Sequence, residues 1–489
     1  MSELAYTPQS AWKTYASAED RQAMRALAER YVEFLSACKT ERETVAYVER
    51  RLAEAGFGPG LNERGETCGA PLAVRIANSD ARSGDYALLR GLHGKALFAV
   101  RRGRRPLAEG FHLISAHTDS PRLDLKQRPL IEQVGVGQAK THYYGGIHKY
   151  QWLARPLALH GVVALPNGEV RTVVIGEDEA DPVFTIEDLL PHLAKKQSTQ
   201  TVADAFEAEK LNVIIGHEPL ADASEGSDAP TKAADAPKEP VKAHILRLLH
   251  DRLAICEEDL LSAELQAVPS GPARFVGLDS ALVGGYGQDD RVCVFTALEA
   301  FLAAEEPEHT CCLIFWDKEE IGSDGSTGAS SRFFEYCVRD MAEAWEPQTG
   351  FGRLMLASRA LSADVHAAID PDWQEVHEKQ NSALIGYGPS FSKFTGSRGK
   401  YGANDAHPEY IGWLRGVLAA RNVPWQMAEL GKVDLGGGGT VALFLAAYGL
   451  DVIDVGPALL GMHSPFELAS VADVYATLQA YRAFFEAGR

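Results

Sequence analysis

The chain has 489 residues, 46% of them hydrophobic and 24% charged, which is the composition of a globular protein. A chain of this length is too long for one ordinary hydrophobic core, so two domains are expected. Asp and Glu (67) outnumber Lys and Arg (48), and the formal charge of −19 disfavours nucleic acids and anionic membranes as partners. The sequence contains no apolar run of about 18 residues that would span a membrane. Its first residues lack a secretion signal, and its seven cysteines form no CxxC pair, which together favour a reducing cytoplasm.

The first part of the chain predicts helices followed by strands. Apolar residues three and four apart indicate an amphipathic helix over 20–37, and Thr40 with Glu43 fits a capping box that opens a second helix, ending at Gly56. Strands are predicted at 95–100 and 111–117. Short strands and turns follow over roughly 127–180, with a hairpin around Asn167 and Gly168.

The segment 219–241 has a different composition. It is rich in Ala, Asp, Pro, Ser and Lys and holds almost no large apolar residue. Such a segment cannot bury enough apolar surface to order itself, so it is predicted to be a flexible loop. Strand-like residues precede it and a helical pattern follows, which places the loop inside a domain rather than between domains.

From about residue 275 the pattern alternates between helices and strands. Helices are predicted over 291–303, 327–345, 404–420, 440–449 and 471–486, and strands over 311–316, 353–364, 383–388, 425–430 and 451–456. This alternation predicts an α/β fold, with a mixed sheet sandwiched by helices. Such a sheet carries its chemistry at the carboxyl ends of its strands.

Acidic and histidine side chains occur where several of these segments end or begin. They are His117 with Asp119, Asp289 with Asp290, the run 317–320, Asp364 and His463. Each group alone fits a structural role, such as a helix cap or a solvated surface. Brought to one edge of one sheet, they must be paired or bind metal.

The donor types indicate which metal chemistry these residues suit. Imidazole and carboxylate are ligands of zinc, and a carboxylate shared by two ions about 3.5–4 Å apart is the bridge expected in a two-metal hydrolase. Asp119 stands two residues beyond His117, on the same side of an extended segment, where it can fix the orientation of a metal-bound imidazole. The chain has no HExxH helix, which excludes a one-zinc protease of that type.

Six strings resemble those of peptidase family M18, the aspartyl aminopeptidase and aminopeptidase I group, and more specifically its bacterial aminopeptidases. In chain order they are SAHTDSPRLDLK (115–126), THYYGGI (141–147), GYGQDDRV (285–292), DKEEIGS (317–323), SADVHAA (362–368) and GMHSP (461–465). They cover nearly the whole chain, and HTDSP, EEIGS and MHSP together are specific to the family.

The resemblance implies a cytoplasmic metalloaminopeptidase that removes N-terminal amino acids from peptides, using a metal-bridged water and a Glu general base. The cofactor would be two divalent ions per subunit, zinc first, with cobalt or manganese as alternatives. The implied ligands are His117 and Asp364 for one ion, Glu320 and His463 for the other, and Asp289 as the bridge. Glu319 would be the base, Asp119 would orient His117, and the peptide bond between Asp289 and Asp290 would be cis.

The resemblance also implies a zinc exopeptidase-like catalytic domain, 1–126 with 273–489, interrupted by a mainly β dimerisation domain over 127–272. Family members assemble from dimers into tetrahedral dodecamers with an enclosed chamber, so the expected partners are further copies of the chain and peptides with a free N-terminus. His192 would reach the active site of a neighbouring subunit, and Lys393 would contact substrate. An ordinary helix histidine and a solvated lysine are the alternatives for these two.

Three other functions stay open at this point. The same metal cluster would serve a deacylase acting on N-acyl amino acids, which needs no free amine. A catalytically silent, self-assembling particle is a second alternative, although every proposed ligand and the base are present. The glycines 436–439 before a predicted helix could cradle a phosphate, but without a GxxxxGK[ST] string close backbone approach is the better interpretation. The stretch after Asp364, VHAAIDPDW, departs from the family and leaves the preferred N-terminal residue open.

Overall fold

The computed structural model describes residues 4–57, 87–221 and 237–488. The chain divides into unit 1, residues 1–120 with 272–489, and unit 2, residues 121–271. Most of the segment expected to form an inserted domain, 127–272, therefore belongs to unit 2. The predicted flexible loop, 219–241, falls mainly on 222–236, which lie outside the described residues, and its last two residues begin a helix.

Unit 1 opens with three helices: α1 (Ala11–Thr14), α2 (Ala18–Ala37) and α3 (Glu41–Glu54). The capping box predicted at the start of α3 is confirmed: the Thr40 side chain accepts from the Glu43 N–H, and the Glu43 carboxylate accepts from the Thr40 N–H. These reciprocal bonds satisfy backbone donors that a helix start leaves unpaired. The predicted helix 20–37 is confirmed as α2.

An eight-stranded mixed sheet forms the centre of unit 1. Its order is β1 (Ala87–Leu92), β2 (Ala96–Arg101), β12 (Thr310–Trp316), β3 (Phe111–His117), β13 (Arg359–Ser362), β19 (Asp451–Gly456), β15 (Ser390–Ser392) and β17 (Gln426–Met427). β3 runs parallel to both β12 and β13, and β13 runs parallel to β19. The carboxyl ends of these four strands therefore meet at one edge, and the predicted α/β class with a mixed sheet is confirmed.

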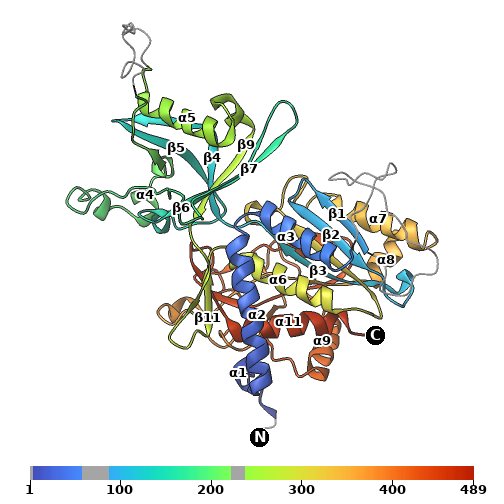
Figure 1. Ribbon diagram of the computed structural model, residues 1–489. Coiled ribbons are helices and arrows are strands. Elements are labelled where there is room, and N and C mark those ends of the chain that lie inside the picture. The colour runs from blue at the N-terminus through green and yellow to red at the C-terminus, as the bar shows by residue number, and fades with distance from the viewer. Residues whose placement is uncertain (1–3, 58–86, 222–236, 489) are drawn as a thin grey trace, which may run out of the picture. The chain divides into compact units, whose positions relative to one another are not determined.

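Helices cover both faces of this sheet (Figure 1). Along β12, Cys311, Leu313 and Phe315 enter one core, and the alternate residues enter the other. The first core packs on α2, α3, α6 (Gln288–Ala303), α9 (Pro408–Ala420) and α11 (Val471–Phe485), and the second on α7 (Phe333–Trp345), α8 (Phe351–Ala357) and α10 (Ala442–Ala446). Because both faces are buried, the central strands read as continuous apolar runs.

A second sheet of unit 1 carries two site-bearing connections. Its order is β10 (Arg274–Val276), β11 (Leu282–Gly285), β21 (Glu467–Ser470), β20 (Ala458–Leu460) and β14 (His366–Ala367). β11 leads into α6, and the connection from β20 to β21 contains His463. The short pair β16 (Gly396–Ser397) and β18 (Gly437–Gly438) stands apart from both sheets.

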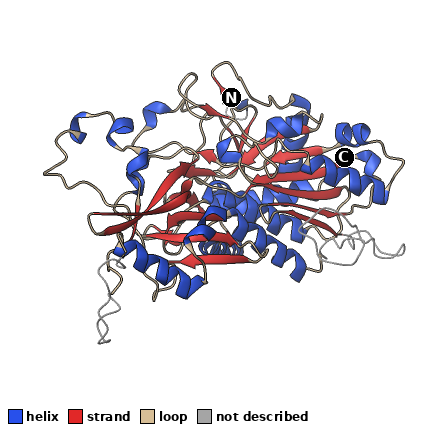
Figure 2. Ribbon diagram, turned by 90° about the horizontal axis from the view of Figure 1, so that it is seen from above, coloured by secondary structure: helices blue, strands red, loops and turns tan. Residues whose placement is uncertain are grey.

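Strands and loops make up most of unit 2 (Figure 2). Its sheet has the order β7 (Val170–Ile175), β6 (Leu157–Ala164), β9 (Ala263–Pro269), β4 (Arg122–Gln133), β5 (Val136–Tyr144) and β8 (Val213–Gly216). The hairpin predicted around Asn167 and Gly168 is confirmed as the β6–β7 turn. Among its described residues, two α-helices accompany the sheet, α4 (Val202–Ala205) and α5 (Pro240–Leu253).

Six predicted elements were wrong in type or in length. The predicted helices 404–420 and 440–449 and the predicted strand 425–430 are shorter in the structure, as α9, α10 and β17. Residues 351–357 form α8 where a strand was predicted over 353–364, so only β13 remains of that strand. The predicted strand 383–388 is a turn: Gly386 and Gly388 have positive φ, and their N–H groups donate to the buried carboxylate of Asp473 at 2.6 and 2.7 Å. The helix predicted from 327 begins only at Phe333.

Asp454, buried in β19, gives a testable pH dependence of stability. Burial raises its pKa to about 6 from 3.8, against the smaller opposing effect of the Ser362 and Thr440 hydroxyls. A carboxyl group with a raised folded-state pKa stabilises the fold below about pH 4, and this contribution is lost as pH rises to about 6. Relative to Asp454→Asn, wild-type protein should lose up to about 3 kcal/mol of unfolding free energy between pH 4 and 7. Urea unfolding of both proteins measures this, and parallel pH profiles would contradict it.

Candidate metal centre

Five segments of unit 1 meet at the carboxyl end of β3. His117 is the last residue of β3 and stands opposite Trp316, the last residue of β12. A 3-10 turn over Glu319–Ile321 follows β12, and Asp289 lies in the first turn of α6. Asp364 follows β13, and His463 lies between β20 and β21. The edge at which parallel strands end thus gathers the acidic and imidazole side chains singled out from the sequence.

The carboxylate of Asp289 lies between two imidazoles. Its Oδ1 is 3.1 Å from Nε2 of His117, and its Oδ2 is 3.2 Å from Nε2 of His463. On the first side, Nε2 of His117 is 3.9 Å from Oδ1 of Asp364. On the second, Nε2 of His463 is 3.4 Å from Oε2 of Glu320. Each oxygen of Asp289 therefore faces a different pair of nitrogen and oxygen donors.

These distances define groups that fit metal ions. Within each group every pair of donor atoms lies within 4.8 Å; the groups are His117 with Asp289 and Asp364, Asp289 with Glu320 and His463, and His117 with Glu319 and Glu320. The first two share Asp289. Oε1 of Glu320 is buried and has no hydrogen-bond partner among the described residues. Nitrogen and carboxylate donors with a spare buried oxygen suit zinc and similar divalent cations.

Asp119 holds the surroundings of His117 in place. Its carboxylate is 3.3 Å from Nδ1 of His117, and its backbone oxygen is 3.1 Å from the same nitrogen, while Nε2 is directed at Asp289. The backbone N–H groups of Glu319 and Glu320 donate to its two carboxylate oxygens, each at 3.2 Å. One buried side chain therefore orients an imidazole and fixes the turn that carries two glutamates.

Burial and charge act against each other at the two histidines and Asp289. Burial lowers the pKa of His117, but hydrogen bonds with Asp119 and Asp289 outweigh it and hold that pKa well above its usual value. Burial raises the pKa of Asp289, but hydrogen bonds with His117 and His463 outweigh it, so the net shift is downward. Asp289 is thus the carboxylate that these surroundings keep ionised.

The remaining carboxyl groups are shifted in the opposite direction. Burial, together with the negative charges of Asp289 and Asp119, raises the pKa of Glu319 to about 7. Burial also raises the pKa of Glu320 and of Asp364 well above their usual values. Crowded carboxyl groups that resist ionisation by themselves have the electrostatics of a cation site.

The backbone at the centre is unusual in three places. The peptide bond between Asp289 and Asp290 is cis, as the family resemblance implied. Lys318, immediately before Glu319, has φ 70°, and His463 has φ 64°. Residues other than glycine rarely adopt this left-handed backbone conformation, and those that do cluster at functional sites.

Two supporting contacts were not foreseen from the sequence. Glu467 is buried and accepts hydrogen bonds from the backbone of Gln288, Asp289 and His463. Asp317 accepts from the Thr327 hydroxyl at 2.8 Å and closes the loop that follows β12. For the Glu467 contacts, the only signal in the sequence is a glutamate four residues after His463. That signal can be interpreted only once the pairing of β21 with β11 is known.

The other residues singled out from the sequence are not part of these groups. Lys393 is exposed, and its Nζ lies 3.5 Å from Oδ1 of Asp405. His192 is exposed in unit 2, beside the exposed Leu193. In the glycine run, a side chain at Gly436 would collide with the backbone of Leu430, and one at Gly437 with that of Gly396. Close backbone approach therefore accounts for these two glycines.

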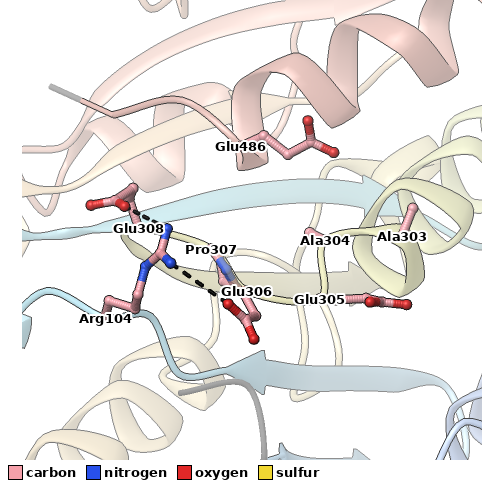
Figure 3. A pocket seen from close by; sticks show the side chains of 8 residues that line it. All are labelled: Arg104, Ala303, Ala304, Glu305, Glu306, Pro307, Glu308 and Glu486. Atoms are coloured by element: carbon pink, nitrogen blue, oxygen red, sulfur yellow. Dashed lines mark hydrogen bonds and ion pairs between the residues drawn. The ribbon is translucent and has the colours of Figure 1, made fainter. Parts of the chain in front are cut away.

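Unit 1 also has a pocket, drawn in Figure 3, whose lining includes none of the residues of the candidate metal centre. Arg104 precedes β3, and the Glu305–Glu308 segment precedes β12, so the pocket lies at the amino ends of strands whose carboxyl ends carry the centre. Arg104 pairs with Glu308 at 2.6 Å and with Glu306 at 3.6 Å. The lining residues are Arg104, Ala303, Ala304, Glu305, Glu306, Pro307, Glu308 and Glu486.

An α/β sheet whose strand ends bring together two imidazoles and several carboxylates is typical of the metal-dependent hydrolases. The chain matches the family described as "Aminopeptidase I zinc metalloprotease (M18)" over residues 34–485, and it belongs to peptidase family M18. It is therefore an aminopeptidase, a metallopeptidase that removes N-terminal residues. Among the described helices, none has both the length and the apolarity needed to cross a bilayer.

Relatives and solved structures agree with this assignment. The chain is 44% identical to a "Probable M18 family aminopeptidase 1" of Clostridium acetobutylicum over 479 residues, 97% of each chain. It is 44% identical to the protein of the same description from Thermotoga maritima over 469 residues, 95% of this chain and 97% of that one. The crystal structure of an M18 aminopeptidase from Thermotoga maritima superposes with a TM-score of 0.87 at 42% identity, covering 99% of this chain and all of that one.

Proposed function

We propose that this aminopeptidase is a dinuclear zinc enzyme in which Asp289 bridges the two ions. The observation that carries the proposal is that each oxygen of Asp289 faces a different imidazole, at 3.1 and 3.2 Å. His117 and Asp364 would complete the site of one ion, and Glu320 and His463 that of the other. Asp289, Glu319, Glu320 and Asp364 are four carboxylates, and two divalent cations would neutralise them.

The proposed general base is Glu319. Its Oε2 is 4.0 Å from Nε2 of His117, and the Glu319 side chain keeps 16% of its surface exposed, so it can reach both the centre and substrate. Divalent ions held by these residues would supply a Lewis acid for the scissile carbonyl and for the attacking water. Glu319 would accept the proton of the attacking water and deliver it to the departing amine. Asp119 would keep Glu319 in place through its backbone N–H.

The substrate proposed for this centre is a peptide with a free N-terminus. A free α-amino group would be held by a metal ion or by a neighbouring carboxylate, whereas an acylated nitrogen can neither be protonated nor donate its lone pair. We expect aminoacyl chromogenic amides to be hydrolysed, their N-acetyl forms to be cleaved at least about 100-fold more slowly, and chelation followed by zinc to remove and restore activity. Equal rates on blocked and free substrates would favour a deacylase instead.

The same panel addresses the questions that family membership leaves open. Varying the first residue among acidic, neutral and basic types identifies the preferred N-terminal residue. Repeating the assay with zinc, cobalt and manganese ranks the cofactors. A protein that binds no metal and hydrolyses none of these amides would favour the silent-particle alternative.

We further propose that the chain self-associates, with the inserted segment 127–272 as its dimerisation domain. The support is a group of apolar side chains in that segment that are exposed to solvent, which is unfavourable for a surface with no partner. They are Val183, Leu189, Leu190, Leu193 and Val202. One fold neighbour, 20% identical, is described as the "mApe1 dodecamer" of yeast. His192 lies among these exposed apolar residues, where a second copy of the chain would cover it. We include in this proposal that His192 reaches the centre of a neighbouring subunit and that Lys393 contacts substrate.

A further inference from the structure

The buried carboxylate of Glu467 fastens two ligand-bearing segments to each other. Its Oε2 accepts hydrogen bonds from the backbone N–H groups of Gln288 at 2.6 Å and Asp289 at 3.2 Å. Its Oε1 accepts from the backbone N–H of His463 at 2.8 Å. The Glu467 residue is 1% exposed. One side chain thus ties the start of α6 to the β20–β21 connection.

The backbone around Glu467 strengthens this link. β21 pairs antiparallel with β11, and Glu467 stands opposite Gly285, just before α6 begins. The backbone oxygen of Glu467 accepts from Nε2 of Gln288 at 2.6 Å, and Oε1 of Gln288 accepts from the Tyr31 hydroxyl at 3.1 Å. The start of α6 is therefore held to Glu467 through both backbone and side chain.

The bond to His463 acts on a residue with an unfavourable backbone conformation. His463 has φ 64°, a left-handed value that an L-residue rarely adopts without support. The Glu467 side chain supplies the acceptor for the N–H of this residue, at 2.8 Å. Without that bond the β20–β21 connection would lose an interaction that aims the His463 ring at Asp289.

We propose that Glu467 is a positioning residue that sets the separation of Asp289 and His463, and so the affinity of the ion held by Asp289, Glu320 and His463. This inference rests on the proposed dinuclear centre. The other ion would depend on Glu467 less, because Asp119 contacts the His117 ring and the side chain of Asp290 accepts from the His117 N–H. Loss of Glu467 therefore weakens the two ion sites unequally.

Glu467→Gln tests the proposal with little change in volume. The amide keeps one acceptor oxygen, but its NH₂ group then faces backbone N–H donors, so at least one of the three hydrogen bonds is lost. We expect one ion per subunit to bind about 10–100-fold more weakly and the other to lose much less of its affinity. Dialysis against buffered zinc, followed by elemental analysis, measures both constants without relying on turnover.

Asp473→Asn is the matched control. Asp473 is equally buried and accepts two backbone hydrogen bonds, from Gly386 and Gly388, but it bonds to neither proposed ligand segment. Its substitution should lower the melting temperature and leave both zinc affinities unchanged. If Asp473→Asn weakened zinc binding as much as Glu467→Gln, general destabilisation would replace positioning as the explanation.

Amide hydrogen exchange of the metal-free proteins gives a readout that needs no ion. Glu467→Gln should speed exchange in peptides containing Asp289 and His463, and Asp473→Asn only around Gly386. Wild-type protein that binds fewer than two ions would overturn the dinuclear centre. Wild-type protein with two ions, together with a Glu467→Gln variant of unchanged affinity and exchange, would overturn the role of Glu467 alone.

Discussion

Glu319→Gln is expected to lower kcat by about 10²–10⁴-fold, while the protein keeps the two proposed metal ions. Gln matches the shape of Glu but cannot accept a proton from water. Glu319 is also outside the two donor groups that share Asp289, so its loss should leave those groups intact. Elemental analysis and steady-state kinetics on an aminoacyl amide measure the two parts of this expectation.

Asp324→Asn is the control for this variant, since Asp324 lies in the same loop but is exposed. It should retain wild-type turnover and metal content. Because Glu319 acts as a base only when it is ionised, the acidic limb of the wild-type pH–rate profile should disappear in Glu319→Gln. Near-normal turnover in the variant would remove Glu319 from the proposed role, whereas loss of metal would make it a ligand.

Local sequence patterns identified three of the central strands, β12, β3 and β19, because burial on both faces makes them apolar throughout. The strands 111–117 and 451–456 and the capping box at Thr40 have the predicted bounds. The segment 383–388 is also apolar, yet it forms a turn. Asp473, which lies in α11 far along the chain, accepts hydrogen bonds from the N–H groups of Gly386 and Gly388. A pattern read locally cannot include that acceptor.

Short motifs predicted which residues come together at the candidate centre, since each motif places its side chains beside a strand end. What could not be read is the framework that fixes their separation. Glu467 is 179 residues from Gln288, and the two meet only because β21 pairs with β11. The helix over 351–357 illustrates the same limit, because its apolar run suits a buried helix as well as a strand.

Asp289→Asn is expected to have the other large effect, and through metal rather than proton transfer. Both oxygens of Asp289 face imidazoles, and its surroundings keep it ionised. An amide supplies one neutral oxygen and an NH₂ group, so it cannot bridge two cations. We expect fewer than two ions per subunit after dialysis, and kcat/KM lower by about 10³-fold or more, since each of the proposed ions would contribute several kcal/mol to transition-state stabilisation.

Comparison with the first variant separates the two contributions. Glu319→Gln should be inactive with its metal retained, and Asp289→Asn inactive with metal lost, whereas the exposed control Asp324→Asn should match wild-type protein in both respects. Excess zinc should restore part of the metal content of Asp289→Asn but little of its activity, because two separately bound ions no longer share a ligand that sets their spacing. An Asp289→Asn protein with two tightly bound ions and near-normal turnover would show that the bridge lies elsewhere.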